Sequence, residues 1–304
     1  MYLCWECCSK LLLSYNSGLT GSIPSSLGSC PVQVLGVSAC QLSGALPPSI
    51  TNWVYLVAFS VHDNFFTGAL PTQLLQGPAI SLVYASNNYF TGSFENLAII
   101  SPYLVLVGLN NNLFSGPSLL PELCGLPLVG LQLADNSFSG SIPSCVGSWV
   151  AMEGLDLSSN RFEGSLPSSM YQMSVLETLV MHSNQFTGPG WIMFISVLFV
   201  SSHRQVLCCV FVVTNIFNNA KLKLLVIGDN QITGLLPVEI FNSSLLSVFI
   251  ASKNCFSGPI SSDICLAGNL ETLGLSGLTS ASLSDIVRRA FCACCRRRSS
   301  PMPV

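Results

Sequence analysis

Apolar and polar positions alternate in short sets along this chain, and the same set returns at a fixed spacing. Residues 131–147 and 155–171 carry one pattern twice, offset by 24 residues, with Leu, Asn, Phe, Gly and Pro in matching places. In the first copy Leu131 and Leu133 stand two apart, so both face one side of a short strand. The pattern therefore predicts a short strand with one inward face, followed by a turn at the Asn.

The glycine four residues after each Asn measures the repeat along the whole chain. Its steps are 23 residues, then six of 24, then 46 and 24. The glycines are Gly21, Gly44, Gly68, Gly92, Gly116, Gly140, Gly164, Gly188, Gly234 and Gly258. The Asn is present in eight copies, Cys40 replaces it in the second, and Asn16 stands one residue early in the first. We expect the Asn amide to satisfy backbone groups of the turn, and the Gly to adopt a conformation that a Cβ would block.

A period of 24 residues with an L-x-L-x-x-N core is the signature of a leucine-rich repeat. One such coil cannot bury its own apolar side, but stacked coils can. We therefore predict one elongated domain, an α/β repeat solenoid with a concave parallel β-sheet. Its expected parts are a remnant or absent N-terminal cap (1–10), repeats (11–188), an apolar register break (189–214), repeats (215–284) and a basic Cys-rich tail (285–304).

The x-x-N-x-F-x-G-x-I-P form is best preserved at residues 136–143, with G-S-I-P-S-S-L at residues 21–27. It resembles the plant-type subclass of leucine-rich repeats, over roughly residues 11–284. The resemblance implies a right-handed superhelix and extracellular recognition on the concave face. The subclass includes ectodomains of receptor-like kinases, receptor-like proteins, inhibitors of secreted cell-wall hydrolases and surface antigens of some protists. The N-terminal cap, export signal and well-formed C-terminal cap of the subclass are not evident here.

Charge is divided unevenly along the chain. Residues 1–287 hold all fourteen acidic and six of the eleven basic residues, a balance of −8, while five arginines give residues 288–304 a balance of +5. An acidic solenoid is not expected to bind nucleic acid. Residues 1–10 show no legible signal peptide, so we expect a truncated or misassigned start. With a signal peptide the protein would be at the cell surface or secreted, and without one cytoplasmic or membrane-associated.

Fourteen cysteines would suffice for several disulfides. Five of them occupy different positions in their repeats and are mostly expected to be buried small hydrophobes: Cys30, Cys124, Cys145, Cys255 and Cys265. Cys4, Cys7 and Cys8 around Trp5 resemble the cap of the subclass, which implies a cap disulfide, and a lone C-x-x-C supports zinc only weakly. The sequon at Asn242 predicts a glycan if the chain is exported.

The step of 46 residues marks a break in the register at residues 189–214. Three interpretations compete: a decayed repeat whose apolar residues fill the core, a non-native insertion such as translated non-coding sequence, and a transmembrane helix at residues 191–213. Against the helix, Arg204 lies near its middle, where an arginine costs about 2.5–3.5 kcal/mol on insertion. Each of the two apolar runs is also too short to span a membrane alone.

The tail reads D-I-V-R-R-A-F-C-A-C-C-R-R-R at residues 285–298. Cys292, Cys294 and Cys295 beside five arginines resemble an S-palmitoylation site with a polybasic patch, and the two signals together could hold a protein on an anionic membrane. The alternatives are a solvated, disordered basic end and, more remotely, a metal site.

Catalytic motifs are absent from the sequence: there is no G-x-S-x-G, P-loop, G-x-G-x-x-G or H-E-x-x-H. We predict no catalytic residue, cofactor or metal site. His62 and His182 occupy the same position of the repeat, five repeats apart, which places them on the order of 24 Å from each other at about 4.8 Å per strand. They cannot share a metal or act as a pair, and each is expected to be a surface residue or a ligand contact.

Three rows of residues are expected to face outward on the concave side, at four, two and one residues before each Asn. Together they are polar and mildly acidic with one aromatic side chain, and exposed tyrosines are common anchors of interfaces. The candidate ligand-binding residues are Ser60, His62, Asp63, Tyr84, Gln132, Asp135, Asp156 and His182. For a single position a soluble strand face explains the residue better than ligand binding does. For the rows as a whole we favour binding, because extended concave surfaces are how solenoids usually bind.

The leading hypothesis is a non-catalytic recognition module, receptor-like or at the cell surface, that binds a protein, peptide or glycan on the concave face. The alternatives are an intracellular scaffold held on a membrane by the acylated tail, and an inactive fragment of a larger receptor-like protein. We also predict that the chain could associate with a membrane, either through residues 191–213 or through the tail.

Overall fold

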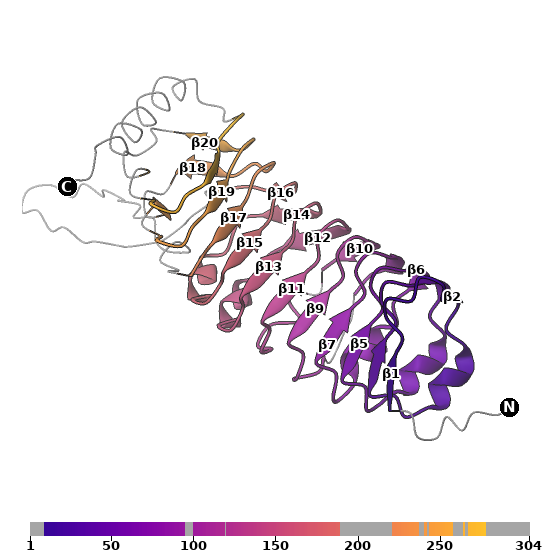
Figure 1. Cartoon of the computed structure of the whole chain (residues 1–304). Coiled ribbons are helices and arrows are strands. Elements are labelled where there is room, and N and C mark those ends of the chain that lie inside the picture. Colours follow the sequence, from indigo (N-terminus) through magenta and orange to yellow (C-terminus); the bar gives the residue numbers. More distant parts are fainter. Residues whose placement is uncertain are drawn as a thin grey trace, which may run out of the picture.

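The computed structural model describes residues 9–94, 100–118, 120–188, 221–236, 240–241, 243–257, 264 and 267–277. In this part of the chain, successive coils stack side by side into an elongated solenoid (Figure 1). Each coil contributes one short strand to the face turned toward the viewer and returns along the opposite side. The predicted leucine-rich repeat solenoid with a concave parallel sheet is confirmed.

The concave sheet has eleven parallel strands, joined in sequence order. The nine inner strands each carry one buried apolar residue at the centre, between two residues that face outward as the period of two requires, and the central Leu11 and Leu273 of the two end strands are partly buried. Equivalent positions lie opposite each other, for example Leu131 and Leu155. The strands are β1 (Lys10–Leu12), β3 (Val34–Gly36), β5 (Ala58–Ser60), β7 (Leu82–Tyr84), β9 (Leu106–Gly108), β11 (Gly130–Gln132), β13 (Gly154–Asp156), β15 (Thr178–Val180), β17 (Leu224–Val226), β19 (Val248–Ile250) and β21 (Thr272–Gly274).

A second parallel sheet follows the turn of each coil, built from the F-x-G part of the repeat. Eight of its strands form one sheet and two more form a separate pair. The eight are β2 (Thr20–Gly21), β4 (Gln41–Ala45), β6 (Phe65–Ala69), β8 (Tyr89–Gly92), β10 (Leu113–Pro117), β12 (Ser137–Ser141), β14 (Arg161–Gly164) and β16 (Gln185–Phe186), and the pair is β18 (Thr233–Leu235) with β20 (Cys255–Ser257).

Short 3₁₀ helices lie on the return side of the coils: η2 (Ser25–Ser29), η3 (Pro48–Asn52), η4 (Thr72–Gln76), η5 (Ser144–Ser148) and η6 (Ser168–Gln172). Each is preceded by the proline that the repeat places three residues after its glycine. At Pro143, for example, φ is −72° and ψ is 151°. The fixed φ of proline therefore sets the extended residue from which the helical turn begins.

The repeat Asn joins the two sheets. Asn160 donates from Nδ2 to the carbonyl of Leu133 in the preceding coil at 2.9 Å, and to carbonyls of its own turn. Its Oδ1 accepts the backbone N–H of Phe138 at 2.9 Å. Because the amide is buried and fully used in this way, the predicted role of the Asn is confirmed. In the second copy the thiol of Cys40 donates to the carbonyl of Leu13 at 3.3 Å, in place of the amide.

Left-handed backbone conformations recur at two positions of every coil. The repeat glycines have φ between 75° and 107°, as predicted. The residue before the Asn is also left-handed, although it carries a side chain: Asp63, Asn87, Asn111 and Asp135 have φ between 52° and 56°. Asp and Asn tolerate this region better than other residues with a Cβ. The polar identity of this row therefore has a backbone cause.

A ladder of phenylalanines fills the core behind the second sheet. Phe66, Phe90, Phe114 and Phe138 are fully buried, and the centroids of successive rings lie 5.9–6.4 Å apart with nearly parallel planes. Phe94 packs against two of these rings, 5.2 Å from that of Phe114. Stacking identical residues at one position of each coil gives a continuous core along the solenoid.

The coils on either side of the register break are direct neighbours in the concave sheet. Strand β15 pairs with β17, with Leu179 opposite Leu225. Asn230 completes the junction by donating to the carbonyl of Met181 at 3.0 Å and accepting the N–H of Phe186 at 3.1 Å. Residues 189–220 lie outside the described part of the chain, so the three interpretations of residues 189–214 stay predictions.

Two of the repeat cysteines depart from the expectation of buried small hydrophobes. Cys124 and Cys145 form a disulfide between adjacent coils, with their Cα atoms 5.7 Å apart. They are 21 residues apart in the sequence, so they do not occupy equivalent positions, and the 24-residue frame alone does not bring them together. Cys30 and Cys40 are free and buried, as expected, and Cys255 is free and half-buried.

Candidate ligand-binding surface

The outward side chains of the concave sheet form the candidate surface, here called the concave face. In each coil, one outward residue stands four positions before the Asn. These residues form one row across the sheet, because neighbouring strands pair in register. Ser60, Tyr84, Asp156 and Val180 of this row are half-buried and Gln132 is exposed. A row of this kind presents a different side chain at every strand while its backbone stays constant.

The predicted residues at the N-terminal end of the concave face lie together. His62 Nδ1 lies 2.7 Å from Asp63 Oδ2, and the His62 ring meets that of Tyr84 edge-on, with centroids 6.3 Å apart. Asp63 Oδ1 also accepts Nδ2 of Asn87 at 2.6 Å. Ser60 shares a hydrogen bond of 2.8 Å with the hydroxyl of Ser38.

The Asp63 carboxylate is stabilised as an anion. Partial burial raises its pKa, but the hydrogen bonds from His62 and Asn87 and the charge of His62 lower it by more, so the pKa lies below its usual value. The Asp63 carboxylate is therefore negatively charged at neutral pH, and it stays in contact with the His62 ring.

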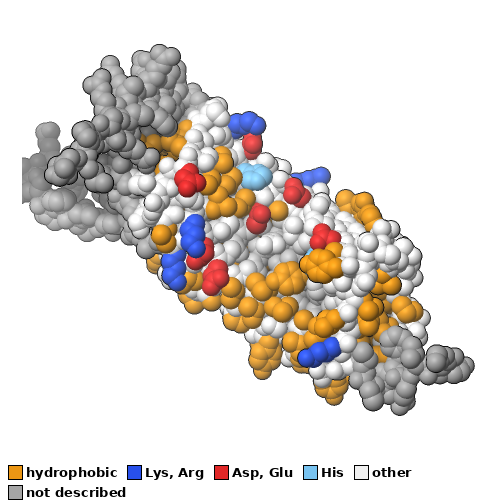
Figure 2. Space-filling view, in the orientation of Figure 1, with side chains coloured by type: hydrophobic (Ala, Val, Ile, Leu, Met, Phe, Trp, Pro, Cys, Tyr) orange, Lys and Arg blue, Asp and Glu red, His pale blue; other side chains and the backbone are white. Residues whose placement is uncertain are grey.

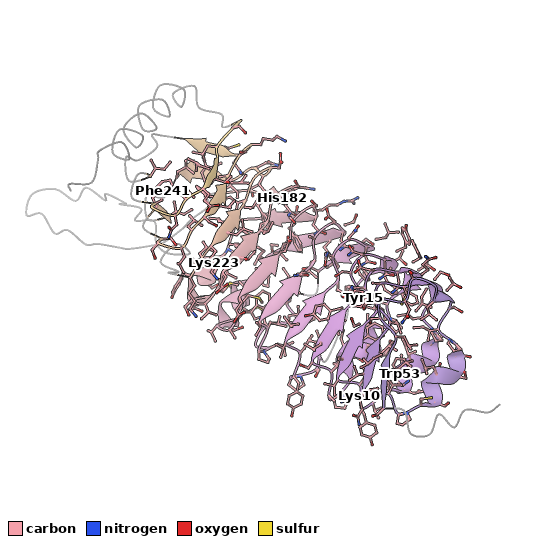
Figure 3. All side chains as sticks on the ribbon, viewed as in Figure 1. Lys10, Tyr15, Trp53, His182, Lys223 and Phe241 are labelled. Carbon is pink, nitrogen blue, oxygen red and sulfur yellow. A yellow bond between two sulfur atoms is a disulfide. The ribbon has the colours of Figure 1, made fainter. Side chains whose placement is uncertain are left out.

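The other four predicted residues do not meet this group. Gln132 and Asp156 stand on the adjacent strands β11 and β13, and Asp135 follows β11 as an exposed residue in the left-handed conformation. Asp156 Oδ1 accepts the hydroxyl of Ser158 at 2.6 Å. His182 follows β15 and contacts Ser183 Oγ at 3.1 Å (Figure 3). The eight predicted residues therefore form two groups along one face.

Sequence reasoning missed two further rows of the concave face, here called the entry rows, at seven and six residues before each Asn. In the N-terminal half they are largely apolar, as at Val57 with Ala58 and at Val105 with Leu106. Further along they become polar, beginning at Glu153. The sequence does contain a signal for these rows. It is the pair of variable positions directly before the inward Leu of each strand, which sequence reasoning did not recognise as facing outward.

Figure 2 shows this change of chemistry across the face, with hydrophobic side chains gathered along the N-terminal half and charged ones toward the C-terminal half. Lys223 Nζ lies 2.7 Å from Glu177 Oε2 across the junction of β15 and β17. Lys253 Nζ lies 2.9 Å from Asp229 Oδ1 one strand further on. The Lys223–Glu177 pair shows that entry-row side chains of neighbouring coils reach each other, and the Lys253–Asp229 pair shows the same for the row one residue before the Asn.

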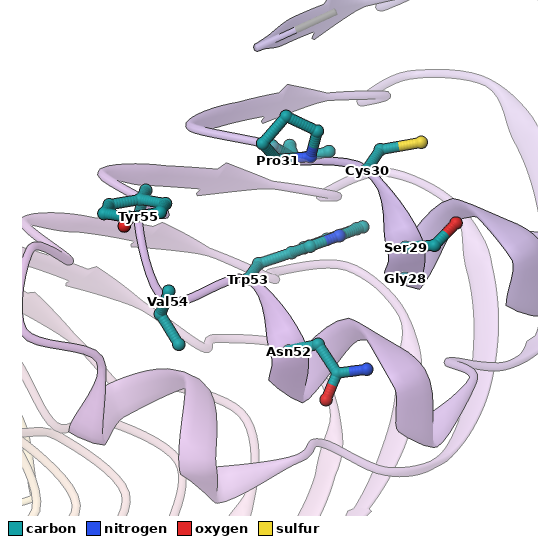
Figure 4. A pocket seen from close by; sticks show the side chains of 9 residues that line it. Gly28, Ser29, Cys30, Pro31, Asn52, Trp53, Val54 and Tyr55 are labelled. Atoms are coloured by element: carbon teal, nitrogen blue, oxygen red, sulfur yellow. The ribbon is translucent and has the colours of Figure 1, made fainter. Parts of the chain in front are cut away.

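A pocket of about 360 Å³ lies away from the predicted residues, between the coils of η2 and η3 (Figure 4). Trp53 lines it and donates from Nε1 to the carbonyl of Leu27 at 3.1 Å. Cys30 and Tyr55 also line it. None of the eight predicted ligand-binding residues takes part.

Two absences concern only the residues that the structure describes. Among these, no three His, Cys, Asp or Glu side chains come close enough to hold a metal ion, and His62 and His182 follow strands that are five positions apart in the sheet. No helix in the same residues is long and apolar enough to cross a bilayer. The candidate membrane segment 191–213, the sequon residue Asn242 and the tail cysteines Cys292, Cys294 and Cys295 lie outside them and stay predictions.

A family model described as Leucine Rich Repeat matches residues 152–173. Among curated proteins nothing matches. Among solved structures, the chain is similar to the leucine-rich repeat ectodomain of the plant membrane receptor kinase GASSHO1/SCHENGEN3 from Arabidopsis thaliana, in complex with CASPARIAN STRIP INTEGRITY FACTOR 2. The identity is 26% and the TM-score 0.75, over 91% of this chain and 31% of that one.

The Arabidopsis receptor kinase HAESA, in complex with the peptide hormone IDA and a co-receptor, is similar at 25% identity and a TM-score of 0.68, over 88% of this chain and 45% of that one. A plant ice-binding protein is similar at 20% identity and a TM-score of 0.61, over 90% of this chain and 84% of that one, a likeness that shows the fold alone. The chain spans less than half the length of either receptor chain.

The repeat motif, the two parallel sheets and these likenesses agree on one class. The chain folds as a leucine-rich repeat solenoid similar to those of plant receptor ectodomains. Solenoids of this class act through extended surfaces, and their fold is not one that assembles catalytic groups in a closed cavity.

Proposed function

We propose that the chain is a non-catalytic recognition module that binds a peptide in extended form along the concave face, as part of a receptor-like protein at the cell surface. The observation that carries the proposal is the concave face itself. Its backbone repeats in register over eleven strands, while its outward side chains differ from strand to strand. A regular backbone with variable side chains suits recognition of a sequence.

Two likenesses support the peptide ligand. The structure of GASSHO1/SCHENGEN3 is a complex with CASPARIAN STRIP INTEGRITY FACTOR 2, and that of HAESA is a complex with a peptide hormone. Tyr84 supports the same reading, because it lies half-buried on the concave face beside His62, where its ring can be covered by a ligand. A glycan ligand remains a prediction from the sequence.

The experiment selects a random twelve-residue peptide library, displayed on phage, on the immobilised chain and measures the Kd of the enriched peptides. Two tyrosines provide a matched pair of variants, since Tyr84 lies on the concave face and Tyr89, half exposed, lies on the second sheet. We expect Tyr84→Ala to weaken binding by about tenfold, the effect of a central aromatic anchor, and Tyr89→Ala to leave it unchanged. The reverse result, or a library that yields no binder, would overturn the proposal.

The disulfide supports a location outside the cytosol. Cys124 and Cys145 are bonded, and structural disulfides persist in oxidising compartments. We expect non-reducing peptide mass spectrometry of the chain from plant cells to find the 124–145 linked peptide. Free thiols at both positions, captured by alkylation in the intact cell, would contradict a cell-surface location. The alternative of a scaffold anchored by the tail depends on residues 285–304 and stays a prediction.

A further inference from the structure

The chemistry of the concave face changes abruptly between neighbouring strands near its middle. Val105 and Leu106 at β9 and Val129 before β11 give the entry rows an apolar surface that is half-buried but not covered by another part of the described chain. One coil further on, the position of Val129 is taken by Glu153, which is exposed. An apolar patch and an anionic group therefore lie about one strand spacing, or 4.8 Å, apart.

Two carboxylates on this coil have no cationic partner. Glu177 on the next coil is neutralised by Lys223 at 2.7 Å. The Asp156 carboxylate accepts hydrogen bonds from the backbone N–H and the hydroxyl of Ser158, and the described residues place no lysine, arginine or histidine in an ion pair with Asp156 or Glu153. The anionic charge at this point of the face is therefore uncompensated within the described structure.

Between these two carboxylates, the backbone of β13 is not covered by side chains at Gly154. A Cβ at Gly130 would meet Leu106 Cδ2 at 2.7 Å, so the Leu106 side chain already covers that glycine. A Cβ at Gly154 would meet nothing within 4 Å. A ligand can therefore approach the backbone at Gly154, between Glu153 and Asp156, more closely than at the neighbouring strands.

We propose, building on the peptide-binding function above, that the occupant of this part of the face is a peptide segment with an apolar side chain on Leu106 and Val129 and a lysine or arginine on Glu153 and Asp156. Charge complementarity selects the cation, and a charge-assisted hydrogen bond to a carboxylate fixes its position. The distance from β9 to β13 is two strand spacings, about 10 Å, which an extended peptide covers in roughly three residues. The apolar and basic residues of the ligand are thus separated by two or three positions.

The test uses peptides enriched on the unaltered chain from the same random library. Their Kd is measured on the isosteric double variant Glu153→Gln with Asp156→Asn, on Gly154→Val, and on Glu163→Gln, an exposed carboxylate of β14 on the second sheet, as the matched control. We expect a lysine or arginine near an apolar residue in the enriched sequences. Affinity should fall about tenfold on the double variant and at least tenfold on Gly154→Val, and stay unchanged on the control.

The outcomes separate this inference from the function on which it rests. Enriched peptides without a basic residue, or with undiminished affinity for the double variant, would overturn the inference and leave peptide binding intact. A library with no binder at all would overturn both. Thermal unfolding of each variant checks that the fold persists, and because the amide substitutions keep size and shape, they decide the result even if Gly154→Val unfolds.

Discussion

The two sheets of the solenoid are built from the same repeat but respond differently to the break in its register. The concave sheet runs without interruption from β1 to β21, and β15 pairs directly with β17. The second sheet ends at β16 and resumes only as the separate pair β18 and β20. Strand pairing is therefore continuous in the concave sheet, which carries the outward variable residues, and interrupted in the second sheet.

The hydrogen bonds of the Asn explain the difference. At the junction, Asn230 reaches back to the carbonyl of Met181 and accepts from Phe186, so the concave register is fixed by a buried side chain as well as by strand pairing. Across the same junction the second sheet has two backbone hydrogen bonds, from the N–H of Gln231 to the carbonyl of Phe186 at 2.8 Å and from the N–H of Thr233 to the carbonyl of Gly188 at 2.9 Å, but the described residues give it no such buried side chain of its own. The comparison indicates that the turn after each concave strand, rather than the second sheet, maintains the stack.

The largest expected effect comes from removing this link. Asn160→Ala leaves the N–H of Phe138 without its buried partner. It also removes one of the two amide donors to the carbonyl of Leu133, the other being Asn136. We expect the free energy of unfolding to fall by about 3 kcal/mol, because an unsatisfied buried group costs about 1–3 kcal/mol and each further lost hydrogen bond about 1 kcal/mol. Urea unfolding followed by circular dichroism measures it. Ser139→Ala, in the second sheet, is the control with little expected change, and an equal loss in both variants would refute the role given to the Asn.

A smaller effect is expected where two 3₁₀ helices meet behind the sheets. A Cβ at Gly147 of η5 would lie 2.8 Å from the backbone carbonyl oxygen of Ser169 in η6, which cannot move aside freely. Gly147→Ala is expected to cost about 2 kcal/mol by overpacking. Gly154→Ala, where space is open on the concave face, is the matched substitution and should leave stability unchanged or raise it slightly. Equal thermal midpoints for the two variants would contradict this difference between the faces.

The smallest effect concerns the Asp63 carboxylate. Its pKa is lowered in the folded chain, so its charge stabilises the fold above the usual carboxyl pKa, and this contribution is lost as the pH falls below about 4 and through the lowered value. We expect the thermal midpoint of Asp63→Asn to fall less than that of the unaltered chain between about pH 4 and pH 2. Parallel pH profiles for the two proteins would show that the contacts of Asp63 with His62 and Asn87 do not stabilise the fold.

Much of the fold could be predicted because each structurally important residue recurs at the same position in many repeats. The inward pair Leu131 and Leu133, the buried Asn and the left-handed Gly recur at one spacing, and a periodic signal of this kind needs no knowledge of distant contacts. The disulfide between Cys124 and Cys145 could not be predicted in the same way, because it joins positions that are not equivalent in the repeat. A contact that occurs only once, such as this disulfide, produces no periodic pattern in the sequence from which it could be predicted.

The candidate surface was predicted only in part, for a related reason. Ser60, Tyr84 and Asp156 were placed correctly on the concave face because they alternate with inward residues. Asp63 and Asp135 have a second explanation that the sequence did not separate from ligand binding, since their left-handed backbone favours Asp. Glu153, Val105 and Val129 were overlooked because they precede their strands, where alternation no longer distinguishes outward from inward positions. Leu106 was overlooked although it is the first residue of β9 and alternates with the inward Val107.

The direct pairing of β15 with β17 also changes how the length of the chain should be counted. The step from Gly188 to Gly234 is 46 residues, nearly twice the usual 24, yet the strands on either side of it, β15 and β17, are direct neighbours in the concave sheet. The length of the chain at this point can therefore change without shifting these strands against each other. In evolution, the outward residues of the concave face and the length of the chain between residues 188 and 221 can then diversify independently of each other.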